Sequence, residues 1–288
     1  MTEKPVTSFE KFNYGLRPAK NIERKMMADG FRRLSGFGKV NEYTYIGMGS
    51  LYFTDFTLFH RLLNFRRMIS IESSDKEKYQ KRFDFNKPFR SIEIKFGRTS
   101  SELPKLKWKD KAVVWLDYDG KLEMECINDI ILLCANAASG TFICFSVNVD
   151  PTKVDFSKTG SSKKESNEEV DEETEDSDEE IRENTFVDEK YVAGESEIRL
   201  LEYLNSEFGE TGLLPSGLDL LDMPGWNFAT VCRQIIDNQI QETLKQRNSL
   251  AEEEEEFHYH QIFNFHYEDG AKMLTVGGVI YQQKDIKK

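Results

Sequence analysis

Two carboxylates flank one tyrosine in the segment Asp117-Tyr118-Asp119-Gly120, directly after the apolar run 112–116. A continuous apolar run of this length is typical of a strand that is buried on both faces of a parallel sheet. Ligands of open α/β sheets bind at the carboxyl ends of such strands. A carboxylate at that place could take the proton of a reacting hydroxyl group. Asp117 and Asp119 are therefore the candidate catalytic residues, and Tyr118 is a candidate for packing against a bound ligand.

A second candidate site is the turn Gly47-Met48-Gly49-Ser50, which joins the aromatic segment 43–46 to the apolar segment 51–63. Glycines allow a sharp strand-to-helix turn and let a ligand approach the backbone closely. Nucleotide-like ligands bind at such turns, beside the amino end of the helix. Many ordinary tight turns also contain two glycines, so this motif alone leaves both interpretations open.

Glu72 ends the predicted strand 66–72 and follows Gly49 by 23 residues. In a βαβ unit, a carboxylate at the end of the second strand accepts hydrogen bonds from the two ribose hydroxyls of a bound nucleoside. The distance along the chain from the glycine turn fits this role. A solvated acid that ends a strand is the alternative, and the sequence does not separate the two.

The elements that would position these residues alternate between strands and helices. Further strands are predicted over 91–96 and 141–148, and a helix with one apolar face is predicted over 122–138. The segments 259–267 and 272–281 alternate on either side of a turn, which predicts a β-hairpin. This order predicts an α/β fold with a Rossmann-like, mostly parallel sheet, helices on both faces and a C-terminal antiparallel hairpin.

Together, these motifs resemble the class I S-adenosylmethionine-dependent methyltransferases. More narrowly, the chain is similar to a bacterial group described as putative O-methyltransferases in four segments: Arg17-Pro-Ala-Lys-Asn-Ile-Glu-Arg24, Tyr45-Ile-Gly-Met-Gly-Ser50, Ser70-Ile-Glu72 and Leu116-Asp-Tyr-Asp-Gly120. The similarity covers about residues 10–150 and 196–281. Ser50-Leu51 stands where many methyltransferases have a third glycine.

The resemblance implies S-adenosylmethionine as the cofactor and methylation of an oxygen atom on an unidentified acceptor. It implies that the glycine turn and the ends of the second and fourth strands bind the cofactor through Tyr45, Gly47, Gly49, Ser50, Glu72, Asp117 and Tyr118. It also implies that a basic N-terminal helix brings Arg17 and Lys20 towards an anionic substrate or the cofactor carboxylate. An amphipathic helix with its basic face in water is the other interpretation of that segment.

Two alternatives to a metal-free enzyme stay open. Asp117 or Asp119, together with Asn148 and Asp150 after the next strand, could hold Mg²⁺ and lower the pKa of a substrate hydroxyl, but the ligand spacing is loose and we assign no metal ligand. The chain could also be a catalytically inactive methyltransferase-like module that binds a nucleotide or a partner. A DNA methyltransferase is disfavoured, because the segment 117–120 lacks the Asn/Asp-Pro-Pro-aromatic motif of enzymes that act on exocyclic amines.

The length and composition limit the class of protein. A chain of 288 residues can bury one sizeable core, so we expect a single methyltransferase-like domain over 1–288, with an N-terminal helical cap over 1–40. There is no run of 18 apolar residues, which predicts no membrane span. The N-terminus has no apolar signal core, which predicts a cytoplasmic protein. The four cysteines have no metal-ligand spacing and are expected to be buried thiols.

Most of the net charge of −12 is concentrated in one segment. Residues 161–190 contain 14 Asp/Glu and 4 Lys/Arg, which leaves about −2 for the rest of the chain. We predict an acidic disordered insertion over 156–195, which is either a solvated loop or a tract that binds a protein partner. The rest of the chain lacks the broad basic stripe that phosphate contacts need, so nucleic-acid binding is not expected.

Overall fold

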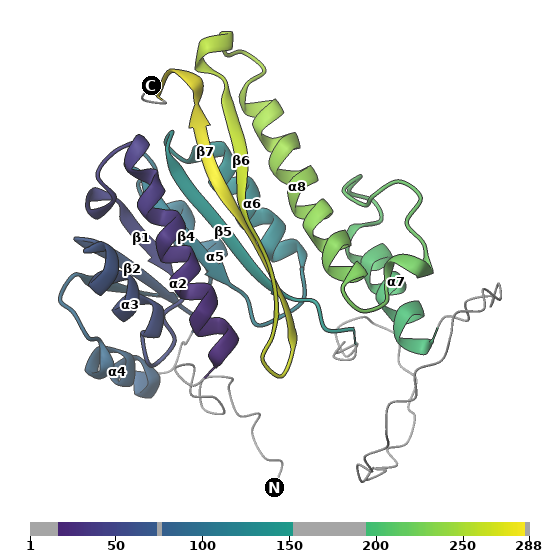
Figure 1. Cartoon of the computed structure of the whole chain (residues 1–288), viewed down its shortest axis with the longest axis horizontal. Helices are drawn as coiled ribbons and strands as arrows, with labels where there is room; N and C mark the ends of the chain where they lie inside the picture. Colours follow the sequence, from purple (N-terminus) through teal and green to yellow (C-terminus); the bar gives the residue numbers. More distant parts are fainter. Residues whose placement is uncertain (1–16, 74–76, 152–193, 286–288) are drawn as a thin grey trace, which may run out of the picture.

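The computed structural model of this chain describes residues 17–73, 77–151 and 194–285 (Figure 1). Residues 1–16 of the predicted N-terminal cap and residues 156–193 of the predicted acidic insertion lie outside the described residues. The predicted end of the insertion needs one correction. Glu195 already begins a helix, α7 (Glu195–Phe208), whose amphipathic pattern buries Leu200 and Leu204.

The strands of the described residues form one sheet of seven, in the order β3-β2-β1-β4-β5-β7-β6. They are β1 (Thr44–Gly47), β2 (Arg67–Glu72), β3 (Ile92–Phe96), β4 (Ala112–Asp117), β5 (Thr141–Asn148), β6 (Phe257–Glu268) and β7 (Lys272–Gln282). Neighbours among the first five strands pair in parallel, and β7 pairs antiparallel with both β5 and β6. The predicted Rossmann-like sheet with its C-terminal hairpin at one edge is confirmed.

Helices cover both faces of this sheet (Figure 1). One face carries α2 (Pro18–Arg32), α3 (Thr54–Leu63) and α4 (Glu77–Asn86). The other face carries α5 (Thr99–Glu102), α6 (Met124–Asn136), α7 and α8 (Asn227–Arg247). The long helix α8 packs on α6 and leads into the hairpin. No described helix combines the length and the apolar composition needed to cross a membrane.

The central strands supply side chains to two separate cores, one on each face. Along β4, Val113 and Trp115 belong to the core under α2 and α3, whereas Val114 and Leu116 belong to the core under α6 and α8. Successive side chains of a strand point to opposite faces, so a strand that is covered on both faces needs an unbroken apolar run. This requirement explains why the run 112–116 predicted its strand correctly.

Helix α2 buries charged side chains together with apolar ones. Lys20, Glu23 and Arg24 share its inner face with Met27 and Phe31, as their helical spacing requires. Lys20 and Arg24 are each 2% exposed. The interpretation of this segment as a helix with its basic face in water is therefore wrong for these two residues, which are buried because each pairs with a carboxylate.

The tip of the hairpin holds the amino end of α2. The Asp269 carboxylate accepts hydrogen bonds from the backbone N–H groups of Ala19 (3.4 Å) and Lys20 (2.9 Å). These are unsatisfied donors of the first helical turn, and a negative charge at this end also matches the helix dipole. The contact joins two segments from opposite ends of the chain next to the carboxyl end of β4.

The four cysteines, Cys126, Cys134, Cys144 and Cys232, are buried free thiols, as expected. Burial raises the pKa of the Cys126, Cys134 and Cys232 thiols to about 12. A thiol with such a pKa carries almost no thiolate at neutral pH, so these cysteines act as small apolar core residues.

Candidate active site

A cavity of about 470 Å³ lies at the carboxyl end of the parallel strands. Its wall contains six of the predicted site residues: Gly49, Ser50, Glu72, Asp117, Tyr118 and Asp119. The volume is within the range of small-molecule and cofactor sites. The position is the one at which ligands of open α/β sheets bind, next to the place where the strand order reverses.

The glycine turn and the end of β2 are joined by hydrogen bonds. The Gly49 N–H donates to Glu72 Oε1 and to Ser70 Oγ, each at 2.9 Å, and the Ser70 hydroxyl donates to the same Glu72 oxygen at 2.5 Å. A Cβ atom on Gly49 would lie 2.6 Å from Ser70 Oγ and 2.7 Å from Phe53 Cδ1. Only glycine therefore fits this position without displacing its neighbours, and the turn places its backbone at the cavity wall.

Ser50 takes the place of a third glycine in backbone conformation. Its φ is 53°, in the left-handed region that glycine adopts most easily. Its hydroxyl oxygen is buried and has no hydrogen-bond partner among the described residues, although Ser50 lines the cavity. Backbone strain and a buried polar group without a partner both cluster at ligand sites. These two features fit a ligand that supplies the missing hydrogen bond.

Glu72 is buried at the cavity wall with 7% of its surface exposed. Burial raises the pKa of this carboxyl to about 7, while the hydrogen bonds from Ser70 and Gly49 act in the opposite direction. A carboxylate that is partly desolvated in this way gains from further hydrogen-bond donors. The hydroxyl groups of a ribose are donors of that kind.

The raised pKa of Glu72 predicts a pH-dependent stability for the ligand-free protein. Below pH 4.5 the carboxyl is protonated in both the folded and the unfolded state, so its burial does not lower the free energy of unfolding. Between pH 4.5 and 7 the unfolded state loses its proton first, so the folded state becomes less stable, by up to about 3 kcal/mol above pH 7. The free energy of unfolding in urea should therefore be higher for Glu72→Gln than for the wild type at pH 8. At pH 4.5 the two free energies should differ little. A difference that is the same at both pH values would contradict this explanation.

The segment after β4 presents its three polar side chains in different environments. Asp117 Oδ1 accepts a hydrogen bond from Lys20 Nζ at 2.8 Å. The Tyr118 hydroxyl donates to Asp129 Oδ2 on α6 at 2.7 Å, which fixes the tyrosine ring in the cavity wall. Asp119 is exposed at the rim of the same cavity. Asp117 is thus held in place, and Asp119 is the carboxylate that solvent and an incoming acceptor can reach.

Four predicted site residues lie away from the cavity wall. The Tyr45 side chain is fully buried against Phe56 and Phe59, because alternation along β1 points it into the core under α3. Gly47 serves packing, since a Cβ there would lie 2.7 Å from the Tyr45 hydroxyl. Lys20 is buried behind Asp117, and half-buried Arg17 precedes α2. The structure thus does not place these four residues in the cavity wall, and their contacts with cofactor or substrate stay predictions.

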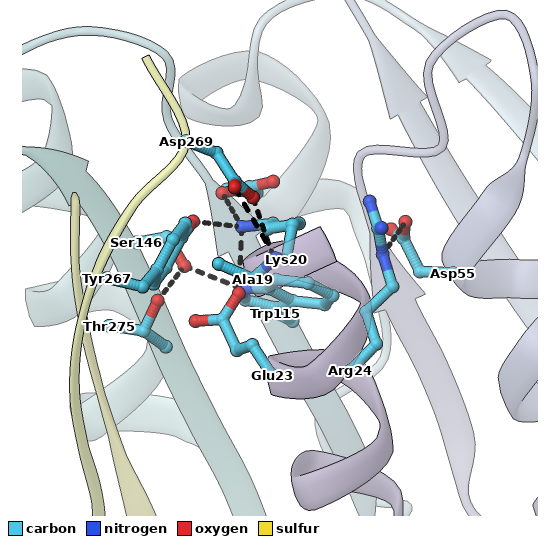
Figure 2. A network of polar contacts seen from close by, with 11 residues as sticks. Ala19, Lys20, Glu23, Arg24, Asp55, Trp115, Ser146, Tyr267, Asp269 and Thr275 are labelled. Carbon is cyan, nitrogen blue, oxygen red and sulfur yellow. Dashed lines mark hydrogen bonds and ion pairs between the residues drawn. The ribbon is translucent and has the colours of Figure 1, made fainter. Parts of the chain in front are cut away.

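Two residues that the sequence did not single out line the cavity instead. Arg24 Nε donates to Asp55 Oδ1 at 3.1 Å, and both side chains are buried in the wall (Figure 2). Arg24 is four residues after Lys20 in the segment 17–24, so helical spacing places the two on one face. That spacing was a signal for Arg24. Asp55 had a weaker signal, as an acid in the first turn of the helix after the glycine turn.

The residues considered as Mg²⁺ ligands are not arranged around a common metal position in the described part of the chain. No group of three or more His, Cys, Asp or Glu side chains in the described residues could hold an ion. Lys121 Nζ lies 3.3 Å from Asn148 Oδ1 and also donates to the Asp150 carbonyl oxygen. The strand end that would supply two of the metal ligands thus binds a lysine ammonium.

No curated protein matches this chain significantly. Among solved structures, an S-adenosylhomocysteine-bound methyltransferase from Podospora anserina aligns over 95% of this chain and 83% of its own, at 9% identity and a TM-score of 0.44. A putative S-adenosylmethionine-dependent methyltransferase from Listeria monocytogenes aligns over 89% and 99%, at 11% identity and a TM-score of 0.42. An O-methyltransferase family protein from Burkholderia thailandensis aligns over 91% of this chain and only 57% of its own, at 10% identity and a TM-score of 0.38.

The family comparison covers nearly the whole sequence. Residues 12–288 match the model of the family described as "Putative O-methyltransferase". The matched range includes the glycine turn, the strand-end carboxylates, helix α2 and the hairpin that holds it. The chain therefore belongs to this O-methyltransferase family.

Proposed function

We propose that this chain is an S-adenosylmethionine-dependent O-methyltransferase whose cofactor site is the cavity at the carboxyl ends of β1, β2 and β4. The observation that carries this proposal is the junction between Gly49 and Glu72. Gly49 has no room for a side chain, and its backbone N–H donates a hydrogen bond to the buried Glu72 carboxylate in the cavity wall. Such a junction offers backbone approach and ribose recognition at one place. The family assignment supports the reaction.

The remaining groups of the wall match the other end of this cofactor, which is a zwitterionic amino acid. Arg24 presents a guanidinium group, the side chain best suited to bind a carboxylate. Asp55 and Asp117 present carboxylates that suit an ammonium group. We assign Arg24 to the cofactor carboxylate and Asp117 to the cofactor ammonium, and Glu72 with Ser50 to the nucleoside side of the site.

When bound, S-adenosylmethionine supplies an electrophilic methyl group on a positively charged sulfur. The protein has to hold the acceptor oxygen in line with that methyl group and to receive the hydroxyl proton, and positioning can lower much of the barrier. Asp119 is the base in this proposal, because it is exposed at the rim of the cavity, where an acceptor can reach it. The Tyr118 ring, fixed by Asp129, shapes the wall between the two carboxylates.

Glu72→Ala is expected to weaken S-adenosylmethionine binding by about 1.5–3 kcal/mol, the usual range for hydrogen bonds to a charged group. That loss corresponds to a rise in Kd of about 10- to 150-fold in isothermal titration. Glu93→Ala is the matched control, since Glu93 is on the adjacent strand β3 and is half exposed outside the cavity. Unchanged affinity in Glu72→Ala, with Glu93→Ala as the reference, would place the cofactor elsewhere.

Several expectations from the sequence stay predictions. They are the cytoplasmic compartment, the bacterial origin, the single domain over 1–288 and the absence of nucleic-acid binding. A protein partner for the acidic insertion also stays a prediction, because residues 156–193 lie outside the described part of the chain.

A further inference from the structure

One buried ammonium group, one buried carboxylate and the half-buried Asp117 carboxylate meet where α2, β4 and the hairpin come together. Figure 2 shows Lys20, Glu23 and Tyr267 of this group. Lys20 Nζ lies 2.8 Å from Asp117 Oδ1 and 3.2 Å from Glu23 Oε2, and it donates to the Tyr267 hydroxyl at 2.8 Å. The ammonium also lies 4.6 Å from the centre of the Trp115 ring. We call Lys20, Glu23, Asp117 and Tyr267 the Lys20 cluster. Only Asp117 of this cluster lines the cavity, so it connects the cluster to the cofactor site.

Glu23 is the unusual member of the Lys20 cluster. Its side chain is 3% exposed, and the polar groups next to it are the Lys20 ammonium, 3.2 Å from Oε2, and the Thr275 hydroxyl. If both carboxylates were ionised, one ammonium would face two negative charges in a buried place. A surplus buried charge of that kind is costly, and protonation removes it. A proton on Glu23 is therefore the less costly state when no further positive charge is present.

The charged and titratable groups around Glu23 lead to the same conclusion. Burial raises the pKa of Glu23, Lys20 opposes this effect, Asp117 adds to it, and the Thr275 hydroxyl opposes it. Burial lowers the pKa of Lys20, but the combined effect of Asp117, Glu23 and Tyr267 holds it well above the usual value, so Lys20 stays charged. Tyr267 of β6 and Cys144 of β5 stay neutral at ordinary pH, since burial raises both pKa values.

Two further charged groups of the neighbouring elements already have partners. Asp269 at the hairpin tip binds the amino end of α2, and Arg24 on the next turn of that helix pairs with Asp55 of α3. Neither supplies a positive charge to Glu23. Glu23, whose pKa is raised by burial, is thus the group in the cluster that can change its charge.

We infer that Glu23 is a positioning residue, which acts through Lys20 on Asp117 and exchanges a proton according to the charge of the bound cofactor. The inference rests on the proposed function. S-adenosylmethionine brings one positive charge to the cavity, which offsets the second carboxylate of the Lys20 cluster, and Glu23 then releases its proton. Methyl transfer breaks the methyl–sulfur bond, leaves its electron pair on sulfur and forms the methyl–oxygen bond. The positive charge is then gone, the acceptor has lost its hydroxyl proton, and Glu23 takes up one proton again.

This exchange makes the protein distinguish methyl donor from product in a pH-dependent way. Because binding of the donor releases a proton, its affinity rises with pH while Glu23 titrates. The neutral product, S-adenosylhomocysteine, gains nothing from that release. The ratio of the product Kd to the donor Kd is therefore expected to rise by up to about tenfold per pH unit in this window.

Isothermal titration in two buffers of different ionisation enthalpy at one pH counts the protons that binding releases. S-adenosylmethionine and sinefungin, which carries an amine in place of the methyl sulfonium, should both release more protons than S-adenosylhomocysteine, by up to about one. Any proton that Glu72 exchanges cancels in this comparison, because all three ligands contain the same ribose. Glu23→Gln should abolish the difference. Asp29→Asn, on the exposed side of the same helix, should keep it.

Equal proton release with charged and neutral ligands in the wild type would overturn the inference, whether or not Glu23→Gln folds. An undiminished difference in a folded Glu23→Gln protein would also overturn it, since the proton would then come from another group. If none of the three ligands bound to the wild type, the proposed function itself would fail. The two failures are therefore distinguishable in one set of titrations.

Discussion

Asp119→Asn is expected to lower methyl transfer by about 10²- to 10⁴-fold, the usual contribution of a general base. Asparagine keeps the shape of the side chain but cannot accept the hydroxyl proton. The affinity for S-adenosylmethionine should change by less than about threefold, because Asp119 is exposed at the rim and its replacement leaves the buried wall intact. A loss in turnover without a loss in cofactor affinity identifies a group that acts in the transition state.

The assay is conversion of S-adenosylmethionine to S-adenosylhomocysteine in the presence of small-molecule fractions from cell extract. Asp110→Asn is the matched control, since Asp110 is exposed at the opposite end of β4. Equal conversion by the wild type and Asp119→Asn would remove Asp119 from the mechanism. Tight cofactor binding without conversion by either protein would favour the alternative, a catalytically inactive methyltransferase-like binding module.

Arg24→Met is expected to destabilise the protein by about 3–5 kcal/mol, because it leaves the buried Asp55 carboxylate without its partner. Burial raises the pKa of Asp55, and Arg24 is the largest influence in the opposite direction. Loss of Arg24 should therefore raise this pKa further and make part of the destabilisation disappear at low pH, where Asp55 binds a proton. Urea unfolding at pH 7 and pH 4 measures both effects.

The double variant Arg24→Met with Asp55→Leu is the control for this result. It removes both charges and replaces them with apolar groups, which is often much less costly than breaking a buried pair. The double variant should be more stable than Arg24→Met alone. The loss in free energy of unfolding of the double variant could instead equal the sum of the losses of the two single variants. The two side chains would then contribute independently, and the buried pair would not explain the stability.

The features that the sequence predicted correctly are those that depend on local patterns. The apolar run 112–116 predicted a central strand, and the carboxyl end of that strand placed Asp117 and Asp119 at the cavity. The interval between Gly49 and Glu72 reflects one strand–helix–strand unit, and in the structure the two residues are hydrogen-bonded. Strand ends and glycine turns have fixed positions in an α/β sheet, so motifs located there transfer well to three dimensions.

The predicted site residues that the structure places away from the cavity wall depend on side-chain direction and on long-range packing. Tyr45 is two residues before Gly47, but strand alternation points its ring into the core away from the cavity. Lys20 and Arg24 looked alike in the sequence as basic residues of one helix. The structure separates them, because Lys20 meets Asp117, 97 residues away in the chain, and Arg24 meets Asp55 in the cavity wall. No local pattern contains those pairings.

The most direct measurement of the central claim is isothermal titration of the wild-type chain with S-adenosylmethionine and, separately, with NAD. Both ligands contain adenosine, but only S-adenosylmethionine has the amino-acid end that Arg24 and Asp117 are proposed to bind. The cofactor cavity described above predicts saturable binding of S-adenosylmethionine at a single site and no binding of NAD under the same conditions. Saturable binding of NAD without binding of S-adenosylmethionine would contradict it.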